Sequence, residues 1–297
     1  MKAKHPILKR GLHWGGSALA IIGIVFVALR LRNYSAEIDF SRFDVAAWIV
    51  IVGLAIIYGL SNLMLASAWR DLLQQFGASA SRRWAIRIYG ISQIARYVPG
   101  NIFHIAGRQA MGMSAGVPSW PLVKSAVWEL GLISASGGLF GLLALPLIVP
   151  GLPVVISAMG FVAVMGITAG LLWRFLSLPV TRAFGWYAGF LAISGLLFVG
   201  VIELLVENPV NGGLSWLPFL GAYVLAWLAG LVTPGAPAGL GVRELVLLFL
   251  LNGVVGEADL LLAVVLGRLV TVVGDFLFFL ISFVTPDKHS ALEKKHG

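Results

Sequence analysis

Seven long apolar stretches constrain the fold of this chain more than any other feature of its sequence. A helix rises about 1.5 Å per residue, so about 20 apolar residues cross the roughly 30 Å hydrocarbon layer of a membrane. The stretches lie near residues 12–29, 45–66, 121–149, 153–173, 185–206, 214–233 and 259–284. We therefore predict an all-α, polytopic integral membrane protein with about seven or eight transmembrane helices, which form a single domain over residues 1–297.

Composition supports lipid, rather than water, as the solvent around these stretches. The sequence is 59% hydrophobic and only 11% charged, whereas soluble domains carry about 25% charged residues. A soluble fold of this length has too little interior to hide so much apolar surface. The excess of 21 Lys and Arg over 13 Asp and Glu is typical of cytoplasmic membrane loops, so we expect no nucleic-acid partner. The sequence has no cysteine, which excludes thiol catalysis, disulfides and cysteine-ligated metals.

Lysine and arginine are enriched in cytoplasmic loops, and their distribution sets the expected orientation. The basic tail 1–11 carries four of them, and residues 70–124 carry seven against Asp71 alone. We expect the N-terminus, residues 70–124 and residues 174–184 on the cytoplasmic side of a bacterial or archaeal plasma (inner) membrane, with an uncleaved first span. Seven full spans place the charged tail 285–297 outside, whereas its three lysines favour the cytoplasm. An interrupted segment that also crosses the bilayer would remove this conflict.

Two segments, 88–111 and 233–255, fit no simple span because proline and glycine interrupt them. Each contains Pro-Gly, at 99–100 and at 234–235, and an arginine nine positions after that proline, Arg108 and Arg243. Lipid cannot pair the backbone groups that such a break exposes, so the break must face protein or a water-filled cavity. Two matching interrupted, re-entrant segments in a pseudo-repeat indicate the binding site of a transporter. The alternative is a coincidence of spacing in a glycine-rich chain, whose prolines only kink helices.

Ionisable residues inside the expected spans need partners, because each costs roughly 2.5–3.5 kcal/mol to insert. Arg268 and Asp275 lie seven residues apart on the last span, on one helix face but too far apart for a tight pair. We expect Glu244 or Asp275 to neutralise Arg243 or Arg268 in one cavity, which leaves the arginines available to a phosphate. The helix that starts after the second break also directs free N–H groups toward an anion.

Three acidic residues are candidates for proton or ion coupling: Glu129, Glu244 and Asp275. Two alternatives remain open. Glu129 is either a buried functional residue or an interfacial one whose carboxylate reaches the headgroups. His104, in the first broken segment, is either a headgroup contact or a hydrogen-bonded packing residue.

The two broken segments resemble a known family. "SQIARYVPGNIFHIAGRQ" (92–109) and "TPGAPAGLGVRELVLLFLL" (233–251) are similar to the paired signatures in the membrane domain of lysylphosphatidylglycerol synthases, also called multiple peptide resistance factors, and of their stand-alone flippase-like homologues. The second stretch, with its P-x-G-L-G-V-R-E core at 237–244, is the more specific. The resemblance covers nearly the whole chain in span layout, but only these two stretches carry the signatures.

The resemblance identifies the positions that we carry over. The matching residues are Gln93, Tyr97, Pro99, Gly100 and Arg108 in the first stretch and Pro237, Gly239, Gly241, Arg243 and Glu244 in the second. Apart from the prolines, these residues form the candidate headgroup-binding set, together with Asn101, His104 and Arg268. Pro99, Pro234 and Pro237 are the candidate helix-breaking residues.

The family resemblance implies a membrane domain that moves a lipid between leaflets. The synthases carry a large soluble transferase domain after this part, whereas about a dozen residues follow the last span here, so we expect no aminoacyl transfer. We expect translocation of an anionic or phosphate-bearing membrane lipid through a basic cavity between the two broken helices, without a cofactor or metal. No ATP-binding G-x-x-x-x-G-K-[ST] run is present, so movement would be downhill or ion-coupled.

Two other functions stay open at this point. One is an intramembrane transferase that acts on a polyprenyl-phosphate or a phospholipid. The other is an accessory membrane subunit for a glycosyltransferase partner.

Overall fold

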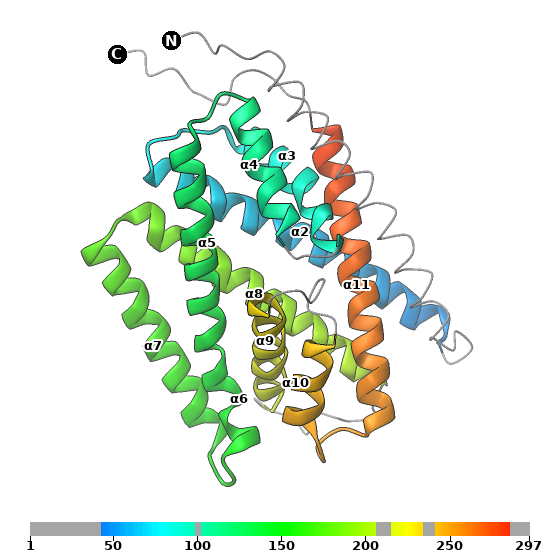
Figure 1. Ribbon diagram of the computed structural model, residues 1–297. Coiled ribbons are helices and arrows are strands. Elements are labelled where there is room, and N and C mark those ends of the chain that lie inside the picture. The colour runs from blue at the N-terminus through cyan, green and yellow to red at the C-terminus, as the bar shows by residue number, and fades with distance from the viewer. Residues whose placement is uncertain (1–42, 99–101, 206–214, 234–240, 286–297) are drawn as a thin grey trace.

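The computed structural model of the protein describes residues 43–98, 102–205, 215–233 and 241–285. Within these ranges all regular secondary structure is helical (Figure 1). The predicted first span at 12–29 and the tails 1–11 and 286–297 lie outside the described residues. The same is true of six candidate residues at the two breaks: Pro99, Gly100, Asn101, Pro234, Pro237 and Gly239.

Five helices of the described ranges are long and apolar enough to cross a membrane. They are α2 (Val45–Gln75), the nearly continuous pair α5 (Ser119–Leu139) and α6 (Gly141–Ile148), α7 (Val154–Phe175), α8 (Leu178–Leu205) and α11 (Glu257–Val284). Each overlaps a predicted span. By length and composition, this is the architecture of a multi-pass membrane protein.

The predicted span at 214–233 forms a shorter element than we expected. Its helix, α9 (Leu217–Val232), has 16 residues and rises about 24 Å, less than the roughly 30 Å hydrocarbon layer. A proline in the first turn suits the helix start, because the missing N–H would be unpaired there anyway.

The surface of α7 indicates what surrounds the bundle. Ser157 is the one buried residue of this helix. Its side chains Val162, Ile167 and Trp173 are each more than half exposed. A contiguous apolar surface of this kind is a liability in water and is ordinary in lipid, so α7 is a lipid-facing helix by its composition.

Glycine contacts set how closely α2 and α11 approach. A Cβ atom added at Gly274 would lie 2.7 Å from the carbonyl oxygen of Ala55, and one added at Gly59 would lie 2.9 Å from that of Gly274. Both neighbours are backbone atoms, which cannot rotate away as a side chain can. Because Asp275 follows Gly274 directly, this contact holds its carboxylate close to α2.

Two broken helix pairs lie between the long helices. The first consists of α3 (Arg82–Gln93), which continues into the 3-10 turn η2 (Ile94–Tyr97), and α4 (Phe103–Ser114), which packs against both. The second consists of α9 and α10 (Val242–Leu251), which also pack together. The order of long helix, broken pair and long helix therefore occurs twice, in α2 to α5 and in α8 to α11.

The two broken pairs contact opposite halves of α11 (Figure 1). On the C-terminal half, Arg87 of α3 donates from Nη1 to the carbonyl oxygen of Thr285 at 3.2 Å, and Gly90 lies against Ser282. On the N-terminal half, Glu244 of α10 pairs with Arg268. The ends of both pairs that adjoin the breaks therefore approach the middle of α11.

Candidate functional site

Three clusters of charged and aromatic side chains lie inside the bundle. The Asp275 cluster consists of Asn62, Gln93, Arg96, Tyr97 and Asp275. Its centre is the Asp275 carboxylate, which is only 1% exposed. Oδ2 accepts from the Tyr97 hydroxyl at 2.7 Å and from Arg96 Nη1 at 3.3 Å, and Oδ1 accepts from Asn62 Nδ2 at 3.2 Å. Gln93 Nε2 extends the network by donating to Asn62 Oδ1 at 3.5 Å.

Local backbone geometry explains why Arg96 and Tyr97 reach the same carboxylate. The chain tightens from α3 into η2, and a 3-10 turn has about three residues per turn rather than 3.6. The turn ends at Val98, whose backbone is extended. The broken segment therefore directs two adjacent side chains at the middle of α11.

The Arg243 cluster consists of Tyr223, Trp227, Arg243, Glu244 and Arg268. Arg268 donates to Glu244 Oε1 twice, from Nη2 at 2.8 Å and from Nε at 3.1 Å. We expected either Glu244 or Asp275 to neutralise Arg243 or Arg268, and the pair of Glu244 with Arg268 is the combination that forms. The structure also confirms that Arg268 and Asp275 find separate partners, since Asp275 pairs with Arg96.

Arg243 differs from the other arginines of the interior. Its guanidinium lies over the ring of Trp227, with Cζ 5.7 Å from the ring centroid. Among the described residues, its buried Nε has no hydrogen-bond partner, and no carboxylate forms an ion pair with the guanidinium. Withdrawal of a cation from water without a counterion is costly, so this partly buried side chain favours an anion or water beside it.

Gly241 positions Arg243 at the start of α10. Its φ of +81° lies in the left-handed region, which residues with a Cβ atom rarely adopt. The first turn of α10 follows directly, so the backbone N–H groups of its first residues have no partner within the helix. These N–H groups add positive potential beside Arg243.

A small hollow lies between Arg243 and Arg268. It has a volume of about 20 Å³ and is lined by side chains of α8 to α11, among them Phe198, Tyr223 and Thr271. A hollow of this size holds about one water molecule. A phosphate would enter only if the neighbouring helices moved apart.

The Arg108 cluster consists of Trp69, Tyr89, Arg108, Ser125 and Glu129. Arg108 Nη2 lies 2.8 Å from Glu129 Oε2, and the Tyr89 hydroxyl donates to Glu129 Oε1 at 2.8 Å. Glu129 is therefore enclosed by the protein, since the residue is 7% exposed and paired.

Aromatic rings cover the Arg108 guanidinium. Its Cζ lies 4.2 Å from the ring centroid of Tyr89 and 5.3 Å from that of Trp69, which are favourable cation–π distances. Despite the short distance to Glu129, no N–H group of Arg108 is aligned for a hydrogen bond with any described residue. The contact is thus an ion pair by distance only.

Arg108 and Arg243 belong to different clusters, although the sequence places them at matching positions of the two broken segments. His104 is buried, and its Nδ1 has no hydrogen-bond partner among the described residues.

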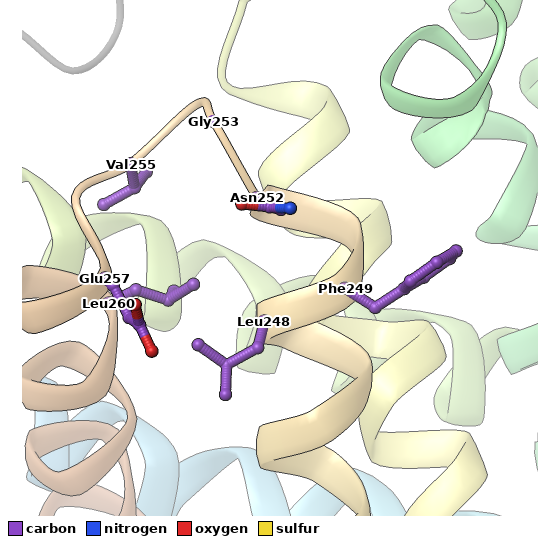
Figure 2. Close-up of a pocket in the computed structure, with 7 residues that line it drawn as sticks. All are labelled: Leu248, Phe249, Asn252, Gly253, Val255, Glu257 and Leu260. Carbon is purple, nitrogen blue, oxygen red and sulfur yellow. The ribbon is translucent and has the colours of Figure 1, made fainter.

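A larger hollow of about 590 Å³ lies where α10 ends and α11 begins (Figure 2). It is lined by Leu248, Phe249, Asn252, Gly253, Val255, Glu257 and Leu260. In Figure 2, the Phe249 ring points away from Leu260 and Glu257. No candidate residue in the described part of the chain lines this hollow, and its lining holds no arginine or lysine, unlike the basic cavity that the sequence predicts.

The sequence did not identify several residues of the clusters as site residues. Asn62 had a usable signal, because an amide in the middle of an apolar stretch indicates a partner inside the bundle. Arg96 lies within the first broken segment but matches no position of the second. Tyr89 and Trp69 had no local signal, since aromatic residues are common in any membrane helix.

Among the described residues, no three histidine or acidic side chains lie close enough to hold a metal ion. Comparison of the chain with models of known protein families and with curated proteins found no match. The case for a function therefore rests on the three clusters.

Proposed function

We propose that the protein translocates a lipid with an anionic, phosphate-bearing headgroup between membrane leaflets. One observation carries the proposal. Arg243 is a partly buried arginine at the start of a short helix, beside a second arginine, and no carboxylate among the described residues neutralises it. A site with an excess positive charge inside a lipid-facing bundle needs an anion, and phosphate suits the planar fork of arginine.

We infer further that the broken pairs α3–α4 and α9–α10 are re-entrant hairpins that enter from opposite faces of the membrane. Their contacts with opposite halves of α11 support this. So does the repeated order of long helix, broken pair and long helix. Transporters built from inverted repeats bind their substrate near the midplane, between such broken elements.

The headgroup site in this proposal lies between Arg243 and Arg268. Arg243 would bind the phosphate oxygens, and the free N–H groups in the first turn of α10 would replace part of the headgroup's hydration. Because the present hollow holds about one water, admission of the headgroup requires α10 to separate from α11. Rocking of one hairpin against the other would open the site to each leaflet in turn.

Membership of the flippase-like family related to lysylphosphatidylglycerol synthases is part of the same proposal. The motif arginines Arg108 and Arg243, with Gln93, Tyr97 and Glu244, all lie in the three internal clusters. This distribution supports a shared function for the two signatures.

The test is headgroup-dependent lipid movement by the purified chain in proteoliposomes. Fluorescent phosphatidylglycerol in the outer leaflet is bleached by dithionite, and movement to the inner leaflet protects it. We expect Arg243→Ala to lower the rate at least tenfold. Arg174→Ala, which removes an exposed arginine of α7, should keep the rate of the unaltered chain.

Three other results would count against the proposal. Equal rates for Arg243→Ala and the unaltered chain would mean that Arg243 does not form an anion site. Equal rates for phosphatidylglycerol and a zwitterionic lipid would mean that movement does not depend on the charge of the headgroup. Formation of a new lipid product by the chain alone would favour the transferase alternative.

A further inference from the structure

We propose that anion movement is coupled to a proton that Asp275 carries, and that Arg96 exchanges between Asp275 and the anion. The proposal rests on the translocation proposed above and adds its energy source. In this scheme Arg96 pairs with Asp275 in the empty site, as in the structure. When the anion arrives, Arg96 turns to it, and Asp275 takes a proton.

Hydrogen-bond geometry makes Arg96 the exchangeable partner of Asp275. Charge-assisted N–H···O bonds usually measure about 2.7–2.9 Å, whereas the Arg96 contact is 3.3 Å long. Tyr97 binds the same oxygen at 2.7 Å. Asn62 holds the other oxygen, so Asp275 keeps two neutral partners when Arg96 leaves.

The position of the cluster suits an exchange between two sites. Asp275, which Arg96 binds, and Arg268, which lines the small hollow with Arg243, lie seven residues and about 10 Å apart on one face of α11. Arg96 is 13% exposed along its side chain, whereas Asp275 is 1% exposed. The arginine therefore has more room to move than the carboxylate.

The ionisable side chains around Asp275 come from three other elements. They are Tyr58 of α2, Arg96 and Tyr97 of η2 and Tyr223 of α9. Arg268 lies two turns away on the same face of α11, and it lines the small hollow together with Arg243 of α10. Gln93 of α3 adds a neutral amide through Asn62. A proton on Asp275 is therefore received among cations and hydroxyls, and Glu244, already paired with Arg268, is the other acid of the centre.

Charge balance gives the coupling its direction. The Asp275 cluster and the Arg243 cluster together hold three arginines and two carboxylates. The arginines are Arg96, Arg243 and Arg268, and the carboxylates are those of Glu244 and Asp275. A monoanion that binds together with a proton leaves the net charge unchanged, which avoids adding charge to a poorly solvated interior. The proton comes from water, forms an O–H bond on the Asp275 carboxylate and ends the Arg96–Asp275 ion pair. By thermodynamic linkage, proton binding and anion binding then strengthen each other.

Glu129 is a poorer carrier, although it is also a buried acid. Its partner Arg108 lies closer, at 2.8 Å, and is covered by the rings of Tyr89 and Trp69. Release of Arg108 would therefore break several contacts at once. The geometry points to Asp275 as the acid that changes its protonation state.

The experiment measures movement of fluorescent phosphatidylglycerol in proteoliposomes under an imposed pH difference or an imposed membrane potential. With the fluorescent lipid in the outer leaflet and a lower pH outside than inside, we expect inward lipid movement at least three times as fast as at equal pH. A potassium–valinomycin potential should have no effect, because a monoanion and a proton move together without net charge. Asp275→Asn should abolish the response to the pH difference, and Glu203→Gln, an exposed acid of α8, should retain it.

Tyr97→Phe provides a second variant that keeps every charge. It removes one donor to the Asp275 carboxylate, so protonation becomes easier, and the pH of half-maximal rate should rise by about one unit. If Asp275→Asn does not fold, this shift in the pH of half-maximal rate tests whether Asp275 carries the proton. An unchanged midpoint would overturn the role of Asp275.

The outcomes separate the two proposals. Movement by the unaltered chain that ignores the pH difference overturns proton coupling and leaves the translocation intact. Movement that responds to the potential instead overturns the one-proton exchange. Absence of anionic lipid movement under any condition overturns the proposed function itself.

Discussion

Arg108 and Glu129 form an ion pair in which each member depends on the other. Removal of one partner of a buried pair leaves an uncompensated charge and costs about 3–5 kcal/mol. We therefore expect Glu129→Leu to destabilise the protein strongly, because Arg108 is 1% exposed and has no second acid among the described residues. Thermal unfolding of the detergent-solubilised protein measures the effect.

The double variant Arg108→Leu/Glu129→Leu is the control for that prediction. The double variant has no buried, unpaired Arg108 charge. It should therefore unfold at a higher temperature than Glu129→Leu alone. A double variant that is less stable than either single one would contradict this. It would mean that the guanidinium contributes mainly by packing against Tyr89 and Trp69.

At the residue scale, local sequence predicted partners only where both members lay near a recognisable motif. The pair of Glu244 and Arg268 was one of the four combinations that the sequence offered, because Glu244 lies in the second broken segment and Arg268 is a charge in the next span. The partner of Asp275 could not be identified, because Arg96 is 179 positions away and several arginines competed for that role. Side-chain pairing across a bundle depends on helix rotation, which a single sequence does not define.

At the element scale, the contact between α2 and α11 depends on two glycines. We expect Gly274→Ala to destabilise the protein by about 1–3 kcal/mol, the usual cost of overpacking, because its new methyl group would meet the backbone of α2. Gly170→Ala on α7 is the matched control, since a Cβ there meets nothing within 4 Å. That change should be neutral or stabilise the helix by up to about 1 kcal/mol.

Thermal unfolding of both alanine variants in one detergent provides the comparison. Equal stability of Gly274→Ala and the unaltered chain would mean that α2 and α11 separate at no cost. It would also mean that close packing at Gly274 is not what holds Asp275 against Asn62.

Long apolar helices were predictable, and shorter elements were predictable only in part. The spans around α2, α7, α8 and α11 follow from hydrophobic length alone. The stretch 214–233 has the same composition, yet its helix α9 has only 16 residues and packs with α10. Apolar length does not distinguish a helix that crosses from one that turns back at midplane, because both are surrounded by apolar atoms.

At the scale of the whole molecule, contacts between helix ends define a basic end of the bundle. Arg182 of α8 forms two hydrogen bonds with Asp71 of α2, and Arg87 of α3 binds the carbonyl of Thr285 at the end of α11. The end of α2 therefore lies beside the start of α8, and the ends of α2 and α11 both lie beside α3. If α9 and α10 enter and return, α11 ends on the cytoplasmic side, which agrees with the three lysines that follow it in the sequence.

The absence of cysteine from the sequence makes this arrangement directly testable. Single cysteines at Arg83, Arg174 and Thr285 should react with a membrane-impermeant maleimide only from the cytoplasmic face, because positive loops stay inside. Single cysteines at Pro150 and Glu257, both exposed at the other end, should react only from the opposite face. Labelling of Thr285→Cys from the same face as Glu257→Cys would mean that α11 does not cross the membrane. The two hairpins would then enter from one face, and the inverted repeat on which alternating access depends would be lost.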